Sequence, residues 1–244
     1  MDCIWPAVMT EEGLREKEVH VWCANLEPGA DQLAALEETL TDAEVERANR
    51  FRFWRQRRRY VAGRGILRVL LGRYLDLNPA EVNLSYNEFG KPFLNTNRLQ
   101  FNLSHSEGVA LYAFCLAEDI GVDLEKIRAI NDAEGIAARF FSPNEYSRLQ
   151  ALPAENRSAA FFACWTRKEA FIKAEGEGLS FPLDDFDVTF SPGEEPRLIT
   201  LGGSTEKAEN WTLFSLVPAA GYAAALAVRG QEWQLSCRHF RQFE

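Results

Sequence analysis

GVDLEKI, residues 121–127, is the stretch around which the rest of the sequence is organised. It has the composition of a β-strand and follows another apolar strand pattern, VALYAFCLA at 109–117. Successive side chains of a strand point to opposite faces, so Asp123 and Glu125 point to the same face. Adjacent carboxylates repel each other, and partial burial strengthens that repulsion. The pattern therefore predicts a positive partner for this pair beside the core.

On both sides of this strand, the sequence follows one plan of a strand, then helices, then further strands. The first half predicts strands at 19–26, 82–94 (with a turn at 90–92), 98–105 and 109–117, and helices at 41–51 and 56–77. The second half predicts strands at 121–127, 186–190, 211–218, 221–228 and 233–240, and helices at 131–140, 142–152 and 157–176. The expected helix caps are Thr41 with Glu44, Asn131, Ser142 and Gly176.

This order of elements predicts the α+β class. Two similar α/β subdomains, at 1–117 and 118–244, are expected to face each other across a cleft. The boundary lies in the polar break near 116–120. A site between the subdomains would combine the acids of GVDLEKI with groups from other elements.

The helix at 157–176 offers such groups. Glu169 and Lys173 are four residues apart and therefore neighbours on its surface. At that spacing most such pairs are solvent-exposed and contribute only about 0.3–0.5 kcal/mol. Lys168 is less ordinary because it falls in the apolar stripe of the helix, where a cation needs an anionic partner.

Three carboxylates with no nearby histidine or cysteine partners favour a hard cation. Mg²⁺ takes oxygen ligands and is usually held by one or two carboxylates together with phosphates of a substrate. Asp123, Glu125 and Glu169 are the predicted ligands. The alternative for Glu125 is that it turns outward to pair with Lys126 or Arg128.

Composition excludes several classes of protein. The 244 residues are 46% hydrophobic and 26% charged, without a biased tract or an apolar run long enough to span a membrane. No signal peptide pattern occurs at the N-terminus. The five cysteines have neither zinc spacing nor a disulfide framework. We therefore expect a cytoplasmic protein that does not associate with membranes.

The charge distribution is uneven. Eight arginines and no acid lie between Arg47 and Arg64, although the net charge of the whole chain is −9. One interpretation is a solvated helix face, and another is a patch that binds polyanions. Because the acidic remainder repels nucleic acid, a small phosphate-rich ligand is favoured over a nucleic acid.

Five blocks in this order carry a family resemblance: NEFGKPFL, FNLSHS, GVDLEKI, RFFSPNEYSRL and FFACWTRKEAFIKAEGEGL. They resemble the signature blocks of the 4′-phosphopantetheinyl transferases, most closely the surfactin-synthetase-activating (Sfp-type) class. The resemblance covers about residues 41–190 and implies a monomer folded as a pseudo-dimer, with the active site between its halves. It also implies Mg²⁺-dependent transfer of the phosphopantetheine arm of coenzyme A to a serine of an apo acyl, peptidyl or polyketide carrier protein, with release of 3′,5′-ADP.

The resemblance also implies roles for single residues. Asp123, Glu125 and Glu169 match the Mg²⁺ ligands, and Asp123, Glu169 and Lys173 match the catalytic set. The residues that match contacts to coenzyme A are Arg47, Lys91, Ser104, His105, Lys168 and Lys173. Some members carry a second basic residue where this chain has Glu44, which leaves Arg59 or another arginine as further candidates for the 3′-phosphate. Glu169 or a metal-bound water would take the serine proton.

Other interpretations of the same residues remain. His105 and Lys91 also suit a loop histidine and a hairpin lysine. A nucleic-acid module built on the arginine run, or a two-metal phosphohydrolase using the same acids, would require neither the GKP block nor the SHS block. For carrier docking we expect the segment at 128–150, with Arg139 among the cations at its rim.

Overall fold

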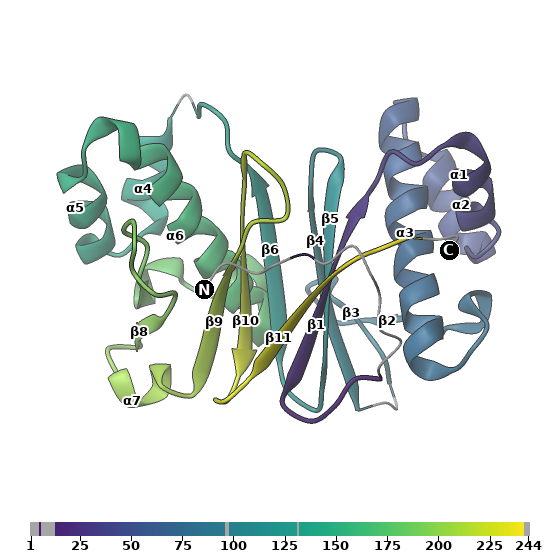
Figure 1. Cartoon of the computed structure of the whole chain (residues 1–244). Coiled ribbons are helices and arrows are strands. Elements are labelled where there is room, and N and C mark those ends of the chain that lie inside the picture. The colour runs from purple at the N-terminus through teal and green to yellow at the C-terminus, as the bar shows by residue number, and fades with distance from the viewer. Residues whose placement is uncertain (1–4, 6–12, 96–97, 131, 242–244) are drawn as a thin grey trace.

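A computed structural model of the chain describes residues 5, 13–95, 98–130 and 132–241. Strands occupy the centre of the molecule, and the longer helices cover its two outer sides (Figure 1). The first half contains β1 (Glu18–Asn25), α1 (Ala30–Glu37), α2 (Asp42–Asn49), α3 (Trp54–Leu75), η1 (Pro79–Glu81), β2 (Ser85–Tyr86), β3 (Pro92–Phe93), β4 (Leu99–Ser106) and β5 (Val109–Leu116). The class is α+β, as the sequence predicted.

The second half begins with the strand that contains Asp123 and Glu125. It contains β6 (Ile120–Lys126), α4 (Ala133–Phe140), α5 (Pro143–Ala151), α6 (Ala154–Glu175), η2 (Gly178–Ser180), η3 (Leu183–Asp185), β7 (Phe186–Val188), β8 (Leu198–Leu201), α7 (Thr205–Ala208), β9 (Trp211–Leu216), β10 (Tyr222–Arg229) and β11 (Gln234–His239). The helix α1 is the main element that the sequence pattern did not predict.

Two sheets form the centre. One has the order β11-β1-β5-β4, and the other has the order β6-β10-β9. The last strand of the second half thus joins the sheet of the first half, pairing parallel to β1 with Val19 opposite Leu235. The predicted division into 1–117 and 118–244 therefore does not hold for residues 234–239.

The halves are nonetheless alike. Each sheet is covered on its outer side by a helix of 22 residues, α3 for the first sheet and α6 for the second. One apolar core lies between α3 and the first sheet, and a second surrounds α6. A third core joins the two sheets through residues such as Val21, Leu111, Val122 and Leu226. Burial between the sheets holds the halves in one arrangement.

The predicted helix ends are largely confirmed. Thr41 and Glu44 form a capping box at α2, and Ser142 and Glu145 form another at α5. Gly176 ends α6 with a φ of 84°, the left-handed conformation that glycine tolerates best. Asp132 is the cap of α4, and the predicted cap Asn131 lies outside the described residues.

A seam of side chains joins the edge of one sheet to the edge of the other. Along β4, Asn102, Ser104 and Ser106 point toward β6. Their oxygens accept hydrogen bonds from the backbone N–H groups of Val122 (2.9 Å), Leu124 (3.3 Å) and Lys126 (3.0 Å). The alternating polar residues of FNLSHS therefore satisfy backbone donors of an edge strand.

The described cysteines differ in their oxidation state. Cys23, Cys115 and Cys164 are buried free thiols, whereas Cys237 is disulfide-bonded, which the cysteine spacing did not predict. No helix among the described residues combines the length and apolarity that a membrane span requires.

Candidate active site

The acids of β6 face α6 because the two elements approach unusually closely. A Cβ atom at Gly121 would lie 2.1 Å from the carbonyl oxygen of Ala170 and 2.4 Å from the backbone nitrogen of Ala174. Only glycine fits such an approach. Since residues 121, 123 and 125 share a face of the strand, Asp123 and Glu125 point toward the same side as α6. The close approach brings Lys173 of α6 beside Asp123.

Asp123 is buried, and its two carboxylate oxygens have different surroundings. Oδ1 lies 2.6 Å from Nζ of Lys173 and accepts a hydrogen bond from Oγ of Ser104 at 2.9 Å. Lys173 also donates to Ser104 Oγ, at 3.1 Å. Oδ2 of Asp123 is buried without a hydrogen-bond partner in the described protein. A buried carboxylate oxygen is costly to leave unpaired, so Oδ2 is suited to a cation or a donor from a ligand.

Glu125 stays on the same side. Its Oε2 accepts a hydrogen bond from Ser106 Oγ at 3.1 Å. Desolvation raises the pKa of Glu125, and the neighbouring charge of Asp123 raises it further. Among the described ion pairs, Glu125 has none with Lys126 or Arg128, so the alternative in which it turns outward is not observed.

Glu169 of α6 is the third acid. Desolvation raises its pKa to about 7, with a further contribution from the charge of Asp123, while Lys173 opposes the shift. The charge of Glu125 raises the pKa of Glu169 as well, so both acids of β6 act electrostatically on the acid of α6. As the side chains stand, no group of three His, Cys, Asp or Glu among the described residues is arranged to hold a metal ion.

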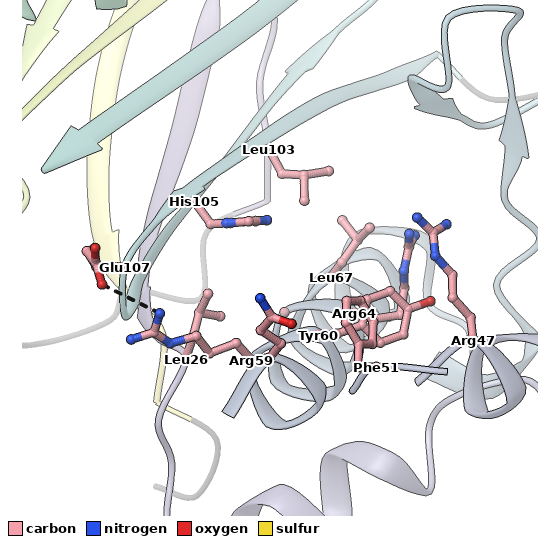
Figure 2. Close-up of a pocket in the computed structure, with 12 residues that line it drawn as sticks. Leu26, Arg47, Phe51, Arg59, Tyr60, Arg64, Leu67, Leu103, His105 and Glu107 are labelled. Carbon is pink, nitrogen blue, oxygen red and sulfur yellow. Dashed lines mark ion pairs between the residues drawn. The ribbon is translucent and has the colours of Figure 1, made fainter. Parts of the chain in front are cut away.

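A groove leads away from these acids. A cavity of about 360 Å³ is lined by Glu169 and Lys173 together with Arg47, Arg64 and Leu103. A neighbouring cavity of about 530 Å³ shares those last three residues. Figure 2 shows this second cavity, with Leu103 and His105 reaching from β4 toward Tyr60 and Arg64 of α3. One continuous groove therefore joins the acids of the second half to the arginines of the first.

Arg47 and His105 both line the larger cavity, and their contacts to coenzyme A stay a prediction. The pKa of His105 is lowered, first by desolvation and then by the positive charge of Lys173. Burial and the charge of Lys173 therefore favour the neutral imidazole of His105, which carries one N–H donor.

Lys168 is not a ligand contact, contrary to the prediction. Its side chain is 1% exposed, and Nζ lies 2.7 Å from Oε2 of Glu145. The same ammonium donates to the carbonyl oxygens of Leu183 and Phe186, at 2.7 and 2.6 Å. Lys168 lies in the apolar stripe of α6 and therefore needed an anionic partner. That partner is Glu145, a buried glutamate of α5.

Ser104, predicted to contact the nucleotide phosphates, and Lys91, predicted to lie beside the adenosine end of coenzyme A, both have hydrogen-bond partners within the protein. The one hydroxyl proton of Ser104 goes to Asp123, and the residue is buried in the seam between the sheets. Lys91 lines the smaller cavity, but its Nζ donates to the carbonyl oxygens of Ile120, Lys173 and Ala174. The ammonium therefore holds the C-terminal end of α6 and has no proton left for a ligand.

The arginine run is largely paired within the protein. Arg57 lies 2.5 Å from Glu37, and Arg59 lies 2.7 Å from Glu27. Such pairing removes much of the positive field that binding along a nucleic-acid backbone would need. Tyr60 and Arg64 also line the groove, although the sequence did not predict a specific role for either residue. In the sequence, both residues stand out only because they lie within the arginine run. Position in the run does not indicate which arginines form ion pairs with acids of the protein.

The segment expected to dock a carrier protein has a mixed character. Phe141 is buried, whereas Phe140 is half-buried against Trp165, with ring centroids 5.8 Å apart. Arg139 is exposed and lies over the Phe140 ring. A cavity of about 390 Å³ beside this segment reaches Glu125. An exposed surface thus adjoins Glu125.

Two family patterns match the chain. Residues 119–227 match the 4′-phosphopantetheinyl transferase superfamily, and residues 24–116 match a 4′-phosphopantetheinyl transferase N-terminal region. Over 231 residues the chain is 42% identical to the 4′-phosphopantetheinyl transferase HetI of Nostoc sp. strain PCC 7120, covering 93% of this chain and 94% of that protein. Over 144 residues it is 38% identical to the 4′-phosphopantetheinyl transferase Sfp of Bacillus subtilis strain 168, covering 59% and 63%.

Proposed function

Because this chain belongs to the 4′-phosphopantetheinyl transferase superfamily, we propose that it transfers the phosphopantetheine arm of coenzyme A to a serine of an apo carrier protein. The observation that carries the proposal is the buried Oδ2 of Asp123, which has no hydrogen-bond partner among the described residues and belongs to the carboxylate that pairs with Lys173. Lys173 and Glu169 line one end of a groove whose other end is lined by arginines. A molecule with a nucleotide, a diphosphate and a long arm matches that distribution of charge.

Coenzyme A fits the groove in one direction. The adenosine and its 3′-phosphate occupy the cavity of about 530 Å³, where Arg47 and His105 supply a cation and a hydrogen-bond donor. The diphosphate then lies in the smaller cavity, beside Lys173. The arm leaves toward Glu125 and the exposed segment that follows β6. Charge-assisted contacts to phosphate are among the stronger polar contacts in proteins.

The acids fit a hard divalent cation such as Mg²⁺. Asp123 offers its unpaired Oδ2, and Glu125 and Glu169 have raised pKa values that a neighbouring cation would lower. Two carboxylates together with the diphosphate of coenzyme A suffice for Mg²⁺, so a preformed cluster of three protein ligands is not required. When bound, the cation would neutralise charge on the diphosphate as a P–O bond breaks.

The reaction is an exchange of bonds at one phosphorus atom. The serine oxygen of the carrier forms a bond to the phosphorus that bears the arm, and the bond from that phosphorus to the bridging oxygen breaks. The electron pair leaves with 3′,5′-ADP. Lys173, held by Asp123 at 2.6 Å, stabilises negative charge on the phosphate. Glu169, which lines the same cavity as Lys173, accepts the serine proton.

The carrier protein docks on the exposed segment that adjoins Glu125. Ile130, Ile136 and Trp165 line the cavity there and provide apolar contacts, and Arg128 lines it as well. Arg139 adds positive charge at the rim. Such a surface suits a partner whose reactive serine stands at the start of an acidic helix.

The direct test mixes the purified protein with coenzyme A, Mg²⁺ and a panel of apo carrier proteins. Intact-mass spectrometry should show the addition of one phosphopantetheine to at least one carrier. Asp123→Ala and Glu169→Ala should each abolish the addition without unfolding the protein. Glu125→Ala should reduce it less, because a water molecule can take one coordination position.

Glu155→Ala is the matched control, because Glu155 is an exposed glutamate on the same helix as Glu169. The control should transfer at the wild-type rate. Near wild-type transfer by Asp123→Ala at saturating Mg²⁺ would contradict the shared acidic site. Release of 3′,5′-ADP from coenzyme A without any carrier would instead favour a phosphohydrolase.

A further inference from the structure

The last turn of α6 ends beside the active site. Lys173, whose ammonium pairs with Asp123, lies in that turn, and Gly176 ends the helix. The final carbonyl oxygens of an α-helix have no partner within the helix, so other groups have to bind them. The groups that bind the backbone oxygens at 173–176 therefore decide how firmly this turn is held.

The partners of these oxygens come from the first half of the molecule, from the hairpin formed by β2 and β3. Nζ of Lys91 donates to the backbone oxygens of Lys173 at 2.6 Å and Ala174 at 3.2 Å. Nδ2 of Asn87 donates to the backbone oxygen of Gly176 at 2.9 Å. A cation at the C-terminal end of a helix also interacts favourably with the helix dipole. The hairpin thus caps α6 across the boundary between the two halves.

Asn87 joins the hairpin to the helix because its amide has both an acceptor and a donor. Its Oδ1 accepts from the backbone N–H groups of Phe89 at 3.0 Å and Lys91 at 2.8 Å, which fixes the turn. Gly90 completes that turn with a φ of 83°. Since Oδ1 is engaged within the hairpin, Nδ2 is directed outward to Gly176.

Lys173 is consequently held from two sides. Its ammonium contacts Asp123 and Ser104, and its backbone oxygen accepts from Lys91. The Lys91 ammonium also donates to the backbone oxygen of Ile120, the first residue of β6, at 3.3 Å. One ammonium therefore ties the end of α6 to the start of the strand that carries Asp123. Without this tie, Lys173 could shift relative to Asp123 while the core around α6 stays packed.

We infer that Asn87 and Lys91 are positioning residues for the transfer reaction, which act through Lys173 and whose side-chain donors do not contact coenzyme A. The inference rests on the proposed function, in which Lys173 stabilises charge on the phosphate. It assigns a role to Asn87, for which the sequence made no prediction. Loss of a ligand contact would raise the KM for coenzyme A, whereas loss of a positioning group lowers mainly kcat.

Two variants remove the cap in different ways. Asn87→Asp keeps an acceptor for the hairpin turn but loses the donor to Gly176, and Lys91→Met loses the ammonium. We expect kcat to fall roughly tenfold to hundredfold in each, because a misplacement of about 1 Å can reduce rates by about 10²-fold. The KM for coenzyme A should stay near the wild-type value. The control Lys207→Met removes an exposed lysine from the last turn of α7 and should change neither constant.

Hydrogen exchange followed by mass spectrometry gives a readout that does not depend on activity. Amides of the last turn of α6, at 173–176, should exchange several-fold faster in both variants than in the wild type. Amides at 160–166, in the middle of the same helix, should keep their wild-type rates. Exchange thus reports the cap, and kcat reports its consequence for the reaction.

The combined results separate the cap from the reaction. Faster exchange with unchanged kcat overturns the positioning role, and unchanged exchange in both variants overturns the cap. A raised KM for coenzyme A at unchanged kcat overturns the inference too, because Lys91 would then be a ligand contact. A wild type that modifies no carrier overturns the proposed function, and the inference falls with it. Should Lys91→Met unfold, Asn87→Asp decides, because it replaces only an amide nitrogen by an oxygen.

Discussion

Gly121→Ala tests whether the close approach of β6 and α6 builds the active site. The added Cβ would lie 2.1 Å from the Ala170 oxygen, and the atoms that it meets belong to the backbone of α6. A side chain that swings aside cannot relieve the contact. Strand and helix have to separate by roughly 1 Å to restore ordinary van der Waals distances.

That separation has two expected costs. Overpacking of this kind destabilises proteins by about 1–3 kcal/mol, which for a chain of this size lowers the melting temperature by roughly 2–12 °C. Separation also moves Lys173 and Glu169 away from Asp123. Because a misplacement of about 1 Å at reacting groups can reduce rates by about 10²-fold, we expect a hundredfold loss of transfer below the melting temperature.

The assay compares three quantities for Gly121→Ala and Gly29→Ala. A Cβ at Gly29 would meet no atom within 4 Å, so this control reports the effect of the added methyl group alone. Transfer rate and melting temperature should fall only for Gly121→Ala. Affinity for 3′,5′-ADP should fall much less than the transfer rate in Gly121→Ala, because most residues of the arginine cavity lie on α2, α3 and β4. A Gly121→Ala enzyme with the transfer rate of the control would refute the argument.

Three further predictions concern other parts of the chain. Lys168→Met should destabilise the fold by about 3–5 kcal/mol, because it leaves Glu145 buried without its partner. In chemical denaturation, the double variant with Glu145→Gln should regain part of the lost free energy of unfolding. The folded fraction of Lys168→Met should have the wild-type KM for coenzyme A. A large increase in that KM would indicate that Lys168 contacts coenzyme A after all. Burial, and then the charge of Arg238, lowers the pKa of His20 to about 4, so the unfolded state binds an additional proton between pH 6.5 and 4. Stability should therefore decrease as the pH falls through that window, by up to about 1.4 kcal/mol per unit, and an equally steep loss in His20→Gln would contradict this. Arg139→Glu should raise the KM for carrier protein several-fold through slower association, without affecting binding of coenzyme A, and a carrier KM with unchanged salt dependence would move the docking surface elsewhere.

The sequence predicted the parts of the site that depend on periodicity. Strand alternation placed Asp123 and Glu125 on one face, and helical spacing placed Glu169 beside Lys173. Caps at Thr41, Ser142 and Gly176 followed from local chemistry, because each depends on residues three or four positions away.

The sequence did not show what lies opposite a given side chain. Lys168 needed an anion, but only the tertiary structure places Glu145 there, 23 positions earlier in the chain. Ser104 and Lys91 belong to conspicuous blocks, yet their polar groups satisfy partners on β6 and α6. Pairing of the arginines was equally hidden, so Arg64 could not be distinguished from Arg57 or Arg59.

The parallel pairing of β11 with β1 has a consequence for how the chain folds during synthesis. β1 is among the first elements to leave the ribosome, whereas its neighbour at 234–239 comes after nearly all the others. Until then one edge of the first sheet has open N–H and C=O groups, which is the kind of surface that recruits other strands. The nascent chain therefore has to protect that edge for almost the whole of its elongation, and a chaperone-depleted extract should aggregate stalled chains that lack residues 234–239 more readily than completed ones.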